Sequence, residues 1–196
     1  MNTFQKYYLS IGSNIGDKLK NIQTALDIIH TKIASFVSIS SVYETKAIGF
    51  KGDNFFNICA SFNSRIEPEN LMNELLQVEI SMGRVRNNND TYESRIIDID
   101  ILIAGHLVIE KQSLKVPHPR MTDRLFVMQP LVEIEPNLLH PILNISCREI
   151  LYKIKNNEGV KKTNLLLNNP INAEISNRYN YIAIEGNIGS GKTSLS

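Results

Sequence analysis

The most constraining feature of this sequence is the stretch Arg-Ile-Ile-Asp-Ile-Asp-Ile-Leu at residues 95–102. Polar and apolar residues alternate there with a period of two, which predicts a β-strand with Asp98 and Asp100 on one face and isoleucines on the other. Two carboxylates about 7 Å apart on one strand face repel each other. A solvated strand face is one reading of this pair. The other is a Mg²⁺ site in which water and phosphate oxygens complete the coordination shell.

Length and composition narrow the class of protein. A chain of 196 residues with 42% hydrophobic residues predicts one domain, or one domain plus part of another. The formal charge of +1 argues against a nucleic-acid-binding protein. Cys59 and Cys147 have no metal-ligand spacing, so we expect small core residues in a reducing compartment. Without a signal-peptide pattern or a membrane-length apolar run, the expected location is the cytoplasm and no membrane partner is expected.

The periodicity predicts an α+β protein whose sheet is mainly antiparallel and flanked by helices. Pro68 suits the first position of the second helix, and Ser146 with Glu149 fits a capping box that opens a short helix. We expect loops at 44–53, 84–94 and 116–119, of which 84–94 is mobile, and a hairpin at Leu107–Ile109 after the Gly105 turn. The expected strands are 7–11, 36–43, 55–62 and 98–102, and the expected helices are 17–33, 68–83 and 146–155.

The C-terminal part differs in composition from the rest of the chain. Residues 156–180 are rich in asparagine and predict a linker, with one short strand at 165–167. Residues 181–185 then form an apolar strand pattern that runs into a G-x-x-x-x-G-K-[ST] motif, the loop whose backbone amides bind phosphate. We interpret residues 181–196 as the beginning of a second domain whose remainder this sequence does not contain. The motif residues are Gly186, Gly189, Gly191, Lys192 and Thr193.

Several residues around the acidic strand are candidates for binding a charged, flat substrate. Arg84, Arg86, Arg95 and Arg124 could grip a polyphosphate, although each alone is compatible with an ordinary surface arginine. His118 lies between two prolines and could donate to phosphate or be structural. Three further residues could bind a heterocycle by stacking or by hydrogen bonds, or could belong to the core and the strand ladder: Phe55, Asn57 and Phe126.

In order and spacing, the short motifs resemble those of 6-hydroxymethyl-7,8-dihydropterin pyrophosphokinase, a family of the folate pathway. The resemblance covers about residues 6–155. The motifs are Ile11-Gly-Ser-Asn14, Ser41-Val-Tyr-Glu-Thr45, Phe55-Phe-Asn57, Glu79 to Gly83-Arg-Val-Arg86, Arg95-x-x-Asp98-Ile-Asp100, Val116-Pro-His118, Met121-x-x-Arg124-x-Phe126 and Pro130-Leu131.

The resemblance implies a ferredoxin-like fold and transfer of the diphosphoryl group of ATP to the hydroxymethyl of a dihydropterin, with release of AMP. Asp98 and Asp100 would bind two Mg²⁺ ions, and Arg84 and Arg95 would be the catalytic arginines that steady the phosphates. The other implied nucleotide contacts are Glu79, Arg86, His118 and Arg124. The implied pterin contacts are Thr45, the backbone around Ile48, Phe55, Asn57 and Phe126.

Two other functions remain open at this point. One is a different Mg²⁺-dependent nucleotidyl or phosphoryl transferase that shares the acidic strand. The other is a silent nucleotide-binding module. The motif at 186–193 is similar to the P-loop of deoxynucleoside kinases. The first domain could therefore also contact a kinase domain of its own chain.

Overall fold

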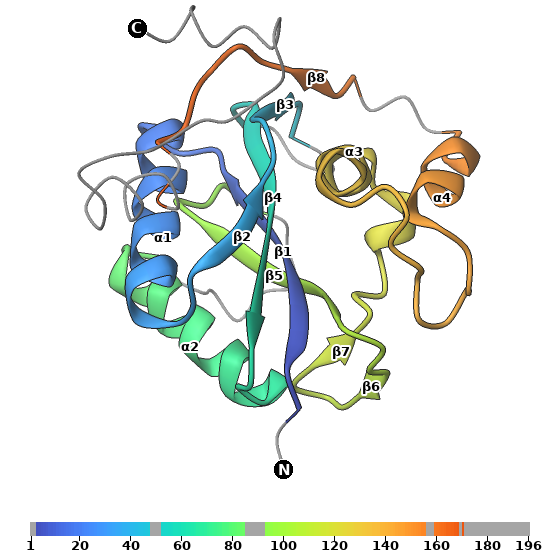
Figure 1. Ribbon diagram of the computed structural model, residues 1–196. Helices are drawn as coiled ribbons and strands as arrows, with labels where there is room; N and C mark the ends of the chain where they lie inside the picture. Colours follow the sequence, from blue (N-terminus) through green and yellow to red (C-terminus); the bar gives the residue numbers. More distant parts are fainter. Residues whose placement is uncertain (1–2, 48–51, 85–92, 156–158, 169, 171–196) are drawn as a thin grey trace, which may run out of the picture.

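The computed structural model describes residues 3–47, 52–84, 93–155, 159–168 and 170. Its centre is a six-stranded sheet with the order β5-β1-β4-β3-β8, in which β2 also pairs with β4 (Figure 1). The sheet strands are β1 (Gln5–Ser13), β2 (Phe36–Ile39), β3 (Tyr43–Thr45), β4 (Phe55–Ser64), β5 (Asp98–Ala104) and β8 (Lys161–Lys162). A separate hairpin consists of β6 (Ile109–Glu110) and β7 (Lys115–Val116). The helices are α1 (Lys18–Lys32), α2 (Pro68–Ser81), the 3-10 helix η1 (Met121–Asp123), α3 (Leu125–Ile134) and α4 (Cys147–Lys153).

All pairings within the sheet are antiparallel, as the sequence predicts. Strands β1 and β2 are both antiparallel to β4, so they are parallel to each other, and α1 connects them. In the same way β4 and β5 are both antiparallel to β1, so they are parallel to each other, and α2 connects them. Two interleaved β-α-β units of this kind make the ferredoxin-like arrangement. The predicted α+β class is therefore confirmed.

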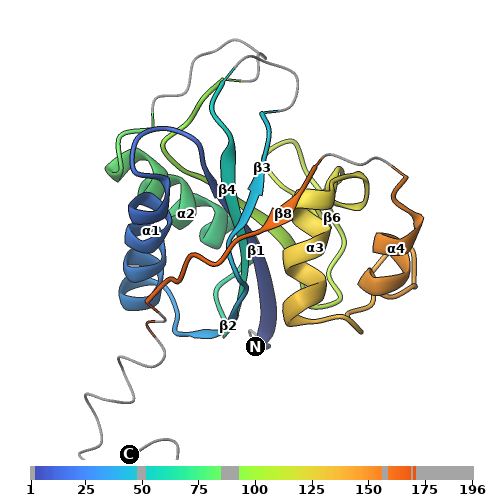
Figure 2. The same cartoon turned by 90° about the horizontal axis from the view of Figure 1, so that it is seen from above.

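Helices cover both faces of the sheet (Figure 2). Leu9, Ile11, Ile99 and Ile101 point to the face covered by α1 and α2, where they join the larger core. Tyr8 points the other way, into a second core between the sheet, α3 and α4. Since side chains alternate along a strand, Asp98 and Asp100 lie on the face of the sheet that α3 and α4 cover.

The helix ends follow the sequence signals. Asp17 accepts a hydrogen bond from Lys20 N and so caps α1, and Pro68 is the first residue of α2. Both hydrogen bonds of the Ser146–Glu149 capping box are present at α4. Gly83 follows α2 with a φ of 91°, a left-handed conformation that glycine adopts without strain.

Three local predictions within residues 36–109 are wrong. The single strand expected at 36–43 is two strands that are separated at residues 40–42, where Cys59 N donates to Ser40 Oγ at 2.9 Å in place of a backbone carbonyl. Two residues of the expected loop 44–53 belong to β3. Residues 107–108 lie outside any strand, and Ile109 pairs with Val116. Helix α3 is not among the expected elements, because most of its residues are apolar and Pro130 lies inside it.

A segment expected to be a linker is held on the domain. Strand β8 pairs with β3, and Thr163 N donates to Val42 O at 2.9 Å. Farther along, Gln23 of α1 exchanges two hydrogen bonds with the backbone of Asn168, at 2.8 and 2.9 Å. The strand predicted at 165–167 is therefore misplaced, and we call residues 161–168 the strap. Within the part of the chain that the structure describes, no helix is both long and apolar enough to cross a membrane.

Glu133, near the end of α3, connects the strap to the sheet. Its carboxylate accepts hydrogen bonds from Ser41 Oγ at 2.8 Å, Tyr43 OH at 2.9 Å and Lys162 Nζ at 3.0 Å. Partial burial opposes ionisation, but the hydrogen bonds from Ser41, Lys162 and Tyr43 outweigh it and lower the pKa of Glu133 below 4.5. This stabilisation is therefore present above about pH 4.5 and is lost as pH falls through the lowered pKa.

We predict that Glu133→Gln lowers the free energy of unfolding by about 1–3 kcal/mol at pH 7, because three donors lose a charged acceptor. It should also speed proteolysis within the strap. Urea unfolding and limited proteolysis at pH 7 and pH 4 are the measurements, and the difference from wild type should shrink at the lower pH. The control is Glu135→Gln, which removes the partner of Lys6 next to the same helix without touching the strap. Equal strap cleavage in both variants would contradict the assignment.

Candidate active site

Three neighbouring strands place site residues in one row. In the register of the sheet, Gly12 of β1 lies opposite Asn57 of β4 on one side and opposite Asp98 of β5 on the other. Asn57 is buried and donates through Nδ2 to Thr45 Oγ1 at 3.0 Å. A Cβ atom at Gly12 would lie 2.8 Å from Asn57 Oδ1, so glycine leaves room for this amide. The expected pterin residues Asn57 and Thr45 are thus brought together, two strand spacings from Asp98.

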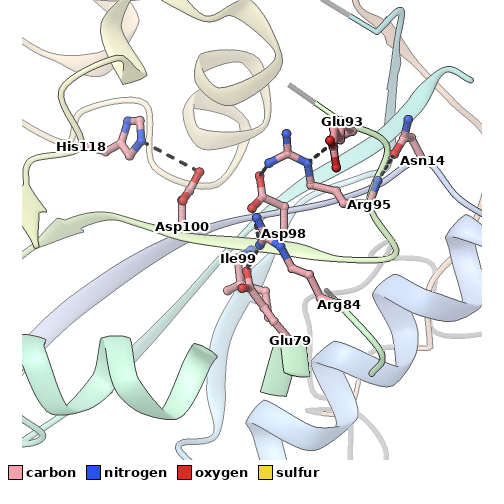
Figure 3. Close-up of polar contacts among 9 residues, drawn as sticks. All are labelled: Asn14, Glu79, Arg84, Glu93, Arg95, Asp98, Ile99, Asp100 and His118. Carbon is pink, nitrogen blue, oxygen red and sulfur yellow. Dashed lines mark hydrogen bonds and ion pairs between the residues drawn. The ribbon is translucent and has the colours of Figure 1, made fainter. Parts of the chain in front are cut away.

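Asp98 lies between two arginines (Figure 3). Its Oδ1 accepts from Arg84 Nη1 at 2.6 Å and its Oδ2 from Arg95 Nη1 at 2.9 Å. Arg84 follows the end of α2 and Arg95 precedes β5, so the helix and the strand direct both guanidiniums to one carboxylate. The two candidate catalytic arginines and one candidate metal ligand therefore form a single ion-pair cluster.

Glu79 lies beneath this cluster. Its side chain is 1% exposed, and its Oε1 accepts from Ile99 N at 2.7 Å and from Arg84 Nη1. Ile99 lies between the two aspartates on β5, which is an edge strand of the sheet formed by the described residues. Glu79 therefore orients Arg84 and attaches α2 to the acidic strand. The structure places it behind Arg84, and the nucleotide contact that the sequence resemblance implied for Glu79 stays a prediction.

Asp100 faces a different set of groups. Its Oδ2 is 3.9 Å from His118 Nε2, which is too long for a hydrogen bond. Partial burial raises the pKa of Asp100 and the charge of Asp98 raises it further, while Arg124 and Arg84 act in the opposite direction. Asp100 is therefore the carboxylate at which added positive charge would stabilise the site most.

His118 is held in its neutral form. Burial lowers its pKa to about 4, and the charges of Arg124 and Arg120 act in the same direction. Nδ1 accepts from Arg120 N at 3.2 Å, so the proton is on Nε2, the nitrogen that faces Asp100 (Figure 3). His118 therefore presents a neutral N–H donor to the site.

The two aspartates fit a magnesium ion as its protein ligands. Hard carboxylate oxygens on one strand face suit Mg²⁺, which keeps several waters or phosphate oxygens in its shell. Among the residues that the structure describes, no group of three or more histidine, cysteine, aspartate or glutamate side chains could hold a metal ion. A cation at Asp98 and Asp100 would thus depend on ligands from substrate and solvent.

The remaining predicted residues divide into two groups. Phe55 begins β4 and Phe126 lies in the first turn of α3, which packs on β4. Arg124 lies over the Phe126 ring, with Cζ 5.4 Å from the ring centroid. Arg86 and Ile48 lie outside the described residues, as do most of the loop expected to be mobile and the motif residues Gly186, Gly189, Gly191, Lys192 and Thr193.

Sequence reasoning did not select Gly12 or Asn14 as site residues. Asn14 is 1% exposed and bonds to Arg95, as described below. A signal was present, because a small residue and then an amide follow an apolar strand at the place where the chain must turn. Their partners lie in distant parts of the sequence, and the local pattern does not identify them.

The sheet, the acid pair and the clustered arginines define the class: an α+β protein with a site suited to a polyphosphate and a divalent cation. Residues 8–136 match the 7,8-dihydro-6-hydroxymethylpterin-pyrophosphokinase (HPPK) family. A 2-amino-4-hydroxy-6-hydroxymethyldihydropteridine pyrophosphokinase from Aquifex aeolicus is 38% identical over 143 residues, which cover 72% of this chain and 88% of that protein. The chain belongs to the HPPK family.

Two further comparisons set the extent of this relationship. A folic acid synthesis protein from Pneumocystis carinii is 35% identical over 148 residues, which cover 75% of this chain but 20% of that protein. The chain spans about a fifth of the length of this and two similar relatives. The crystal structure of wild-type Plasmodium falciparum HPPK-DHPS with pteroate has a TM-score of 0.69 at 15% identity, covering 85% of this chain and 47% of that one. This likeness shows the shared fold.

We predict that Glu79→Gln lowers the free energy of unfolding by about 1–3 kcal/mol, because the amide cannot accept from both Ile99 N and Arg84 as the carboxylate does. Urea unfolding measures the change. The control is Glu69→Gln on the same helix, which removes only the surface ion pair with Lys111 and should leave stability nearly unchanged. Equal losses in the two variants would show that Glu79 does not hold the strand and Arg84 together.

Proposed function

We propose that this chain transfers the diphosphoryl group of ATP to the hydroxymethyl group of 6-hydroxymethyl-7,8-dihydropterin in folate biosynthesis. The products are AMP and the pterin diphosphate. The observation that carries this proposal is the row of Asn57, Gly12 and Asp98 across three strands. In this row the Asn57 amide, which we assign to the heterocycle, lies two strand spacings from the acid–arginine cluster, which we assign to the triphosphate. Membership of the HPPK family supports the same reaction.

In this proposal Asp98 and Asp100 would hold two Mg²⁺ ions, which when bound would supply positive charge to offset that of the triphosphate. Arg84 and Arg95 exchange part of their pairing with Asp98 for phosphate oxygens, to which the planar guanidinium is well matched. Glu79 keeps Arg84 pointing to the site during this exchange. Arg86 and Arg124 add further positive charge for the nucleotide.

His118 acts as a neutral hydrogen-bond donor to phosphate. Its Nδ1 is occupied by Arg120 N, and its lowered pKa keeps Nε2–H available without a net charge at neutral pH. A protonated histidine beside Asp100 would instead compete with a metal ion for that carboxylate. His118 therefore orients the nucleotide and does not transfer a proton.

The pterin binds near Asn57, at the opposite end of the Asn57–Gly12–Asp98 row from the phosphate groups. Phe55 and Phe126 stack on its two faces, and Thr45, Asn57 and the backbone near Ile48 bond to its polar edge. The amide of Asn57 is suited to this because it offers a donor and an acceptor in one plane, and its bond to Thr45 fixes which is which. A buried amide bonded in this way rejects rings that lack the matching groups.

The reaction does not require a strong general base. A primary alcohol held in line with the β-phosphorus is positioned for attack, and most of the acceleration comes from placement and charge neutralisation. The site accordingly consists of carboxylates, arginines and a neutral histidine.

Product analysis with the full chain, ATP, Mg²⁺ and 6-hydroxymethyl-7,8-dihydropterin tests the proposal. Pterin-dependent formation of AMP and a pterin diphosphate is the expected result. ADP or pyrophosphate as product would instead favour another phosphoryl or nucleotidyl transferase. Nucleotide binding without turnover would favour a silent binding module.

We predict that Asp98→Asn and Asp100→Asn each reduce AMP formation at least about 100-fold at saturating Mg²⁺, through loss of metal binding at the transition state. Their stabilities should differ. Asp98→Asn removes the partner of two arginines and should be less stable than wild type. Asp100→Asn removes a repulsive charge and should be at least as stable. The control, Asp27→Asn on the outer side of α1, should retain wild-type turnover. Near wild-type rates in either site variant would rule out the metal assignment.

We also propose that residues 186–193 are the phosphate-binding loop of a separate, deoxynucleoside-kinase-like unit. The support is the sequence motif with its preceding apolar stretch. Lys192→Ala should then leave pterin-dependent AMP formation unchanged, because this loop belongs to a different nucleotide site. Steady-state kinetics of the two proteins provide the measurement. A clear decrease in the variant would show that the loop contributes to the pterin reaction.

A further inference from the structure

Asn14 joins three segments that surround the candidate site. It follows the last residue of β1, and its side chain is 1% exposed. Its Nδ2 donates to Ser94 Oγ at 3.0 Å and to Asp53 O at 3.3 Å. Its Oδ1 accepts from Arg95 N at 2.7 Å. One buried amide thus bonds to both segments that lead into strands β4 and β5.

The backbone of Asn14 adds a second connection to Arg95. Asn14 N donates to Arg95 O at 3.1 Å, while Arg95 N donates to the Asn14 side chain. Both polar groups of the Arg95 main chain are therefore held by the same residue. The Arg95 side chain then extends to Glu93 O at 3.3 Å and to Asp98 at 2.9 Å (Figure 3). The direction of the guanidinium therefore depends on where Asn14 holds the Arg95 main chain.

We infer that Asn14 is a positioning residue for diphosphoryl transfer and that it acts through Arg95. This inference rests on the function proposed above. The Arg95 guanidinium has to bind phosphate oxygens in a defined geometry, and its position depends on that of the Arg95 main chain. A displacement of about 1 Å can cost about 100-fold in rate. Asn14 has no hydrogen bond to Asp98 or Asp100 among the described residues, so its effect on the acidic strand passes through the segment 93–95.

The chemistry of the amide explains why asparagine is suited to this position. It combines one acceptor with two N–H donors on a short side chain, and here each is matched to a partner on a different segment. Aspartate keeps the acceptor for Arg95 N but turns an oxygen toward the carbonyl of Asp53. Alanine offers no acceptor to Arg95 N and no donor to Ser94 Oγ or Asp53 O. The bond to Asp53 also places the start of β4, where Phe55 lies, in the same network.

A double-mutant cycle tests the inference. Asn14→Ala, Arg95→Ala and the double variant are compared with wild type by kcat and by KM for ATP and for the pterin. Asn14→Ala should lower kcat at least about tenfold with a smaller change in the KM for the pterin. In the Arg95→Ala background the same substitution should lower kcat less than about twofold, because the group that Asn14 positions is already absent. Multiplicative losses in the double variant would overturn the inference.

Asn21→Ala is the matched control. Asn21 also donates through its amide to the turn after β1, to Ser13 Oγ at 3.1 Å and Ile15 O at 2.8 Å, but it has no bond to 93–95. Its kcat should stay within about twofold of wild type even where its melting temperature falls as much as that of Asn14→Ala. An equal loss of kcat in Asn21→Ala would overturn the inference, because a general loosening of the turn would then explain the effect.

Asn14→Asp and Ser94→Ala keep the test usable if Asn14→Ala does not fold. Asn14→Asp retains the acceptor for Arg95 N but turns an oxygen toward Asp53 O, so its kcat should fall by about twofold to tenfold. Ser94→Ala removes one partner of Asn14 and should lower kcat at least about twofold, but by a smaller factor than Arg95→Ala. Unchanged kcat in both would overturn the inference. If the wild-type chain forms no AMP, the proposed function itself is wrong.

Discussion

Alternation along β5 is the constraint on which the rest of the site depends. Ile99 and Ile101 are almost fully buried under α1 and α2, so a shift of one residue would expose them and drive two carboxylates into the core. The apolar core therefore holds Asp98 and Asp100 on the opposite face despite their mutual repulsion. The free energy gained by burying the isoleucines of this strand therefore outweighs the repulsion between its two carboxylates.

The charges around the strand are arranged so that most of this repulsion is offset. Arg84 lies between Glu79 and Asp98, and Arg95 reaches Asp98 from the other side. Each of these carboxylates thus has a cationic partner at hydrogen-bond distance, as partly buried ion pairs require. Asp100 differs, since its near neighbour His118 is neutral. An incoming cation would gain most at this position, and the arginines would then be available to phosphate.

The helices that carry cap signals or an apolar stripe could be predicted, because these signals are local. Asp17, Pro68 and Ser146 begin helices as expected. Helix α3 is not predicted in this way, since apolar residues occupy most of its positions, Pro130 lies inside it, and it packs against β4. Likewise Ser40 interrupts an alternating stretch because its hydroxyl bonds to Cys59, a residue that only tertiary structure brings close.

The acid pair on one strand face, the arginines near it and the order of motifs that identifies the family can all be read from the amino-acid sequence. Three contacts follow from the folded chain alone: Glu79 lies behind Arg84, Gly12 makes room for Asn57, and Asn14 holds Arg95. The last two contacts join residues that are far apart in the chain, 81 positions in the case of Asn14 and Arg95. They depend on the register of β1 against β4 and β5. Local periodicity predicts the face of a side chain, but the partner opposite it follows only from how the strands align.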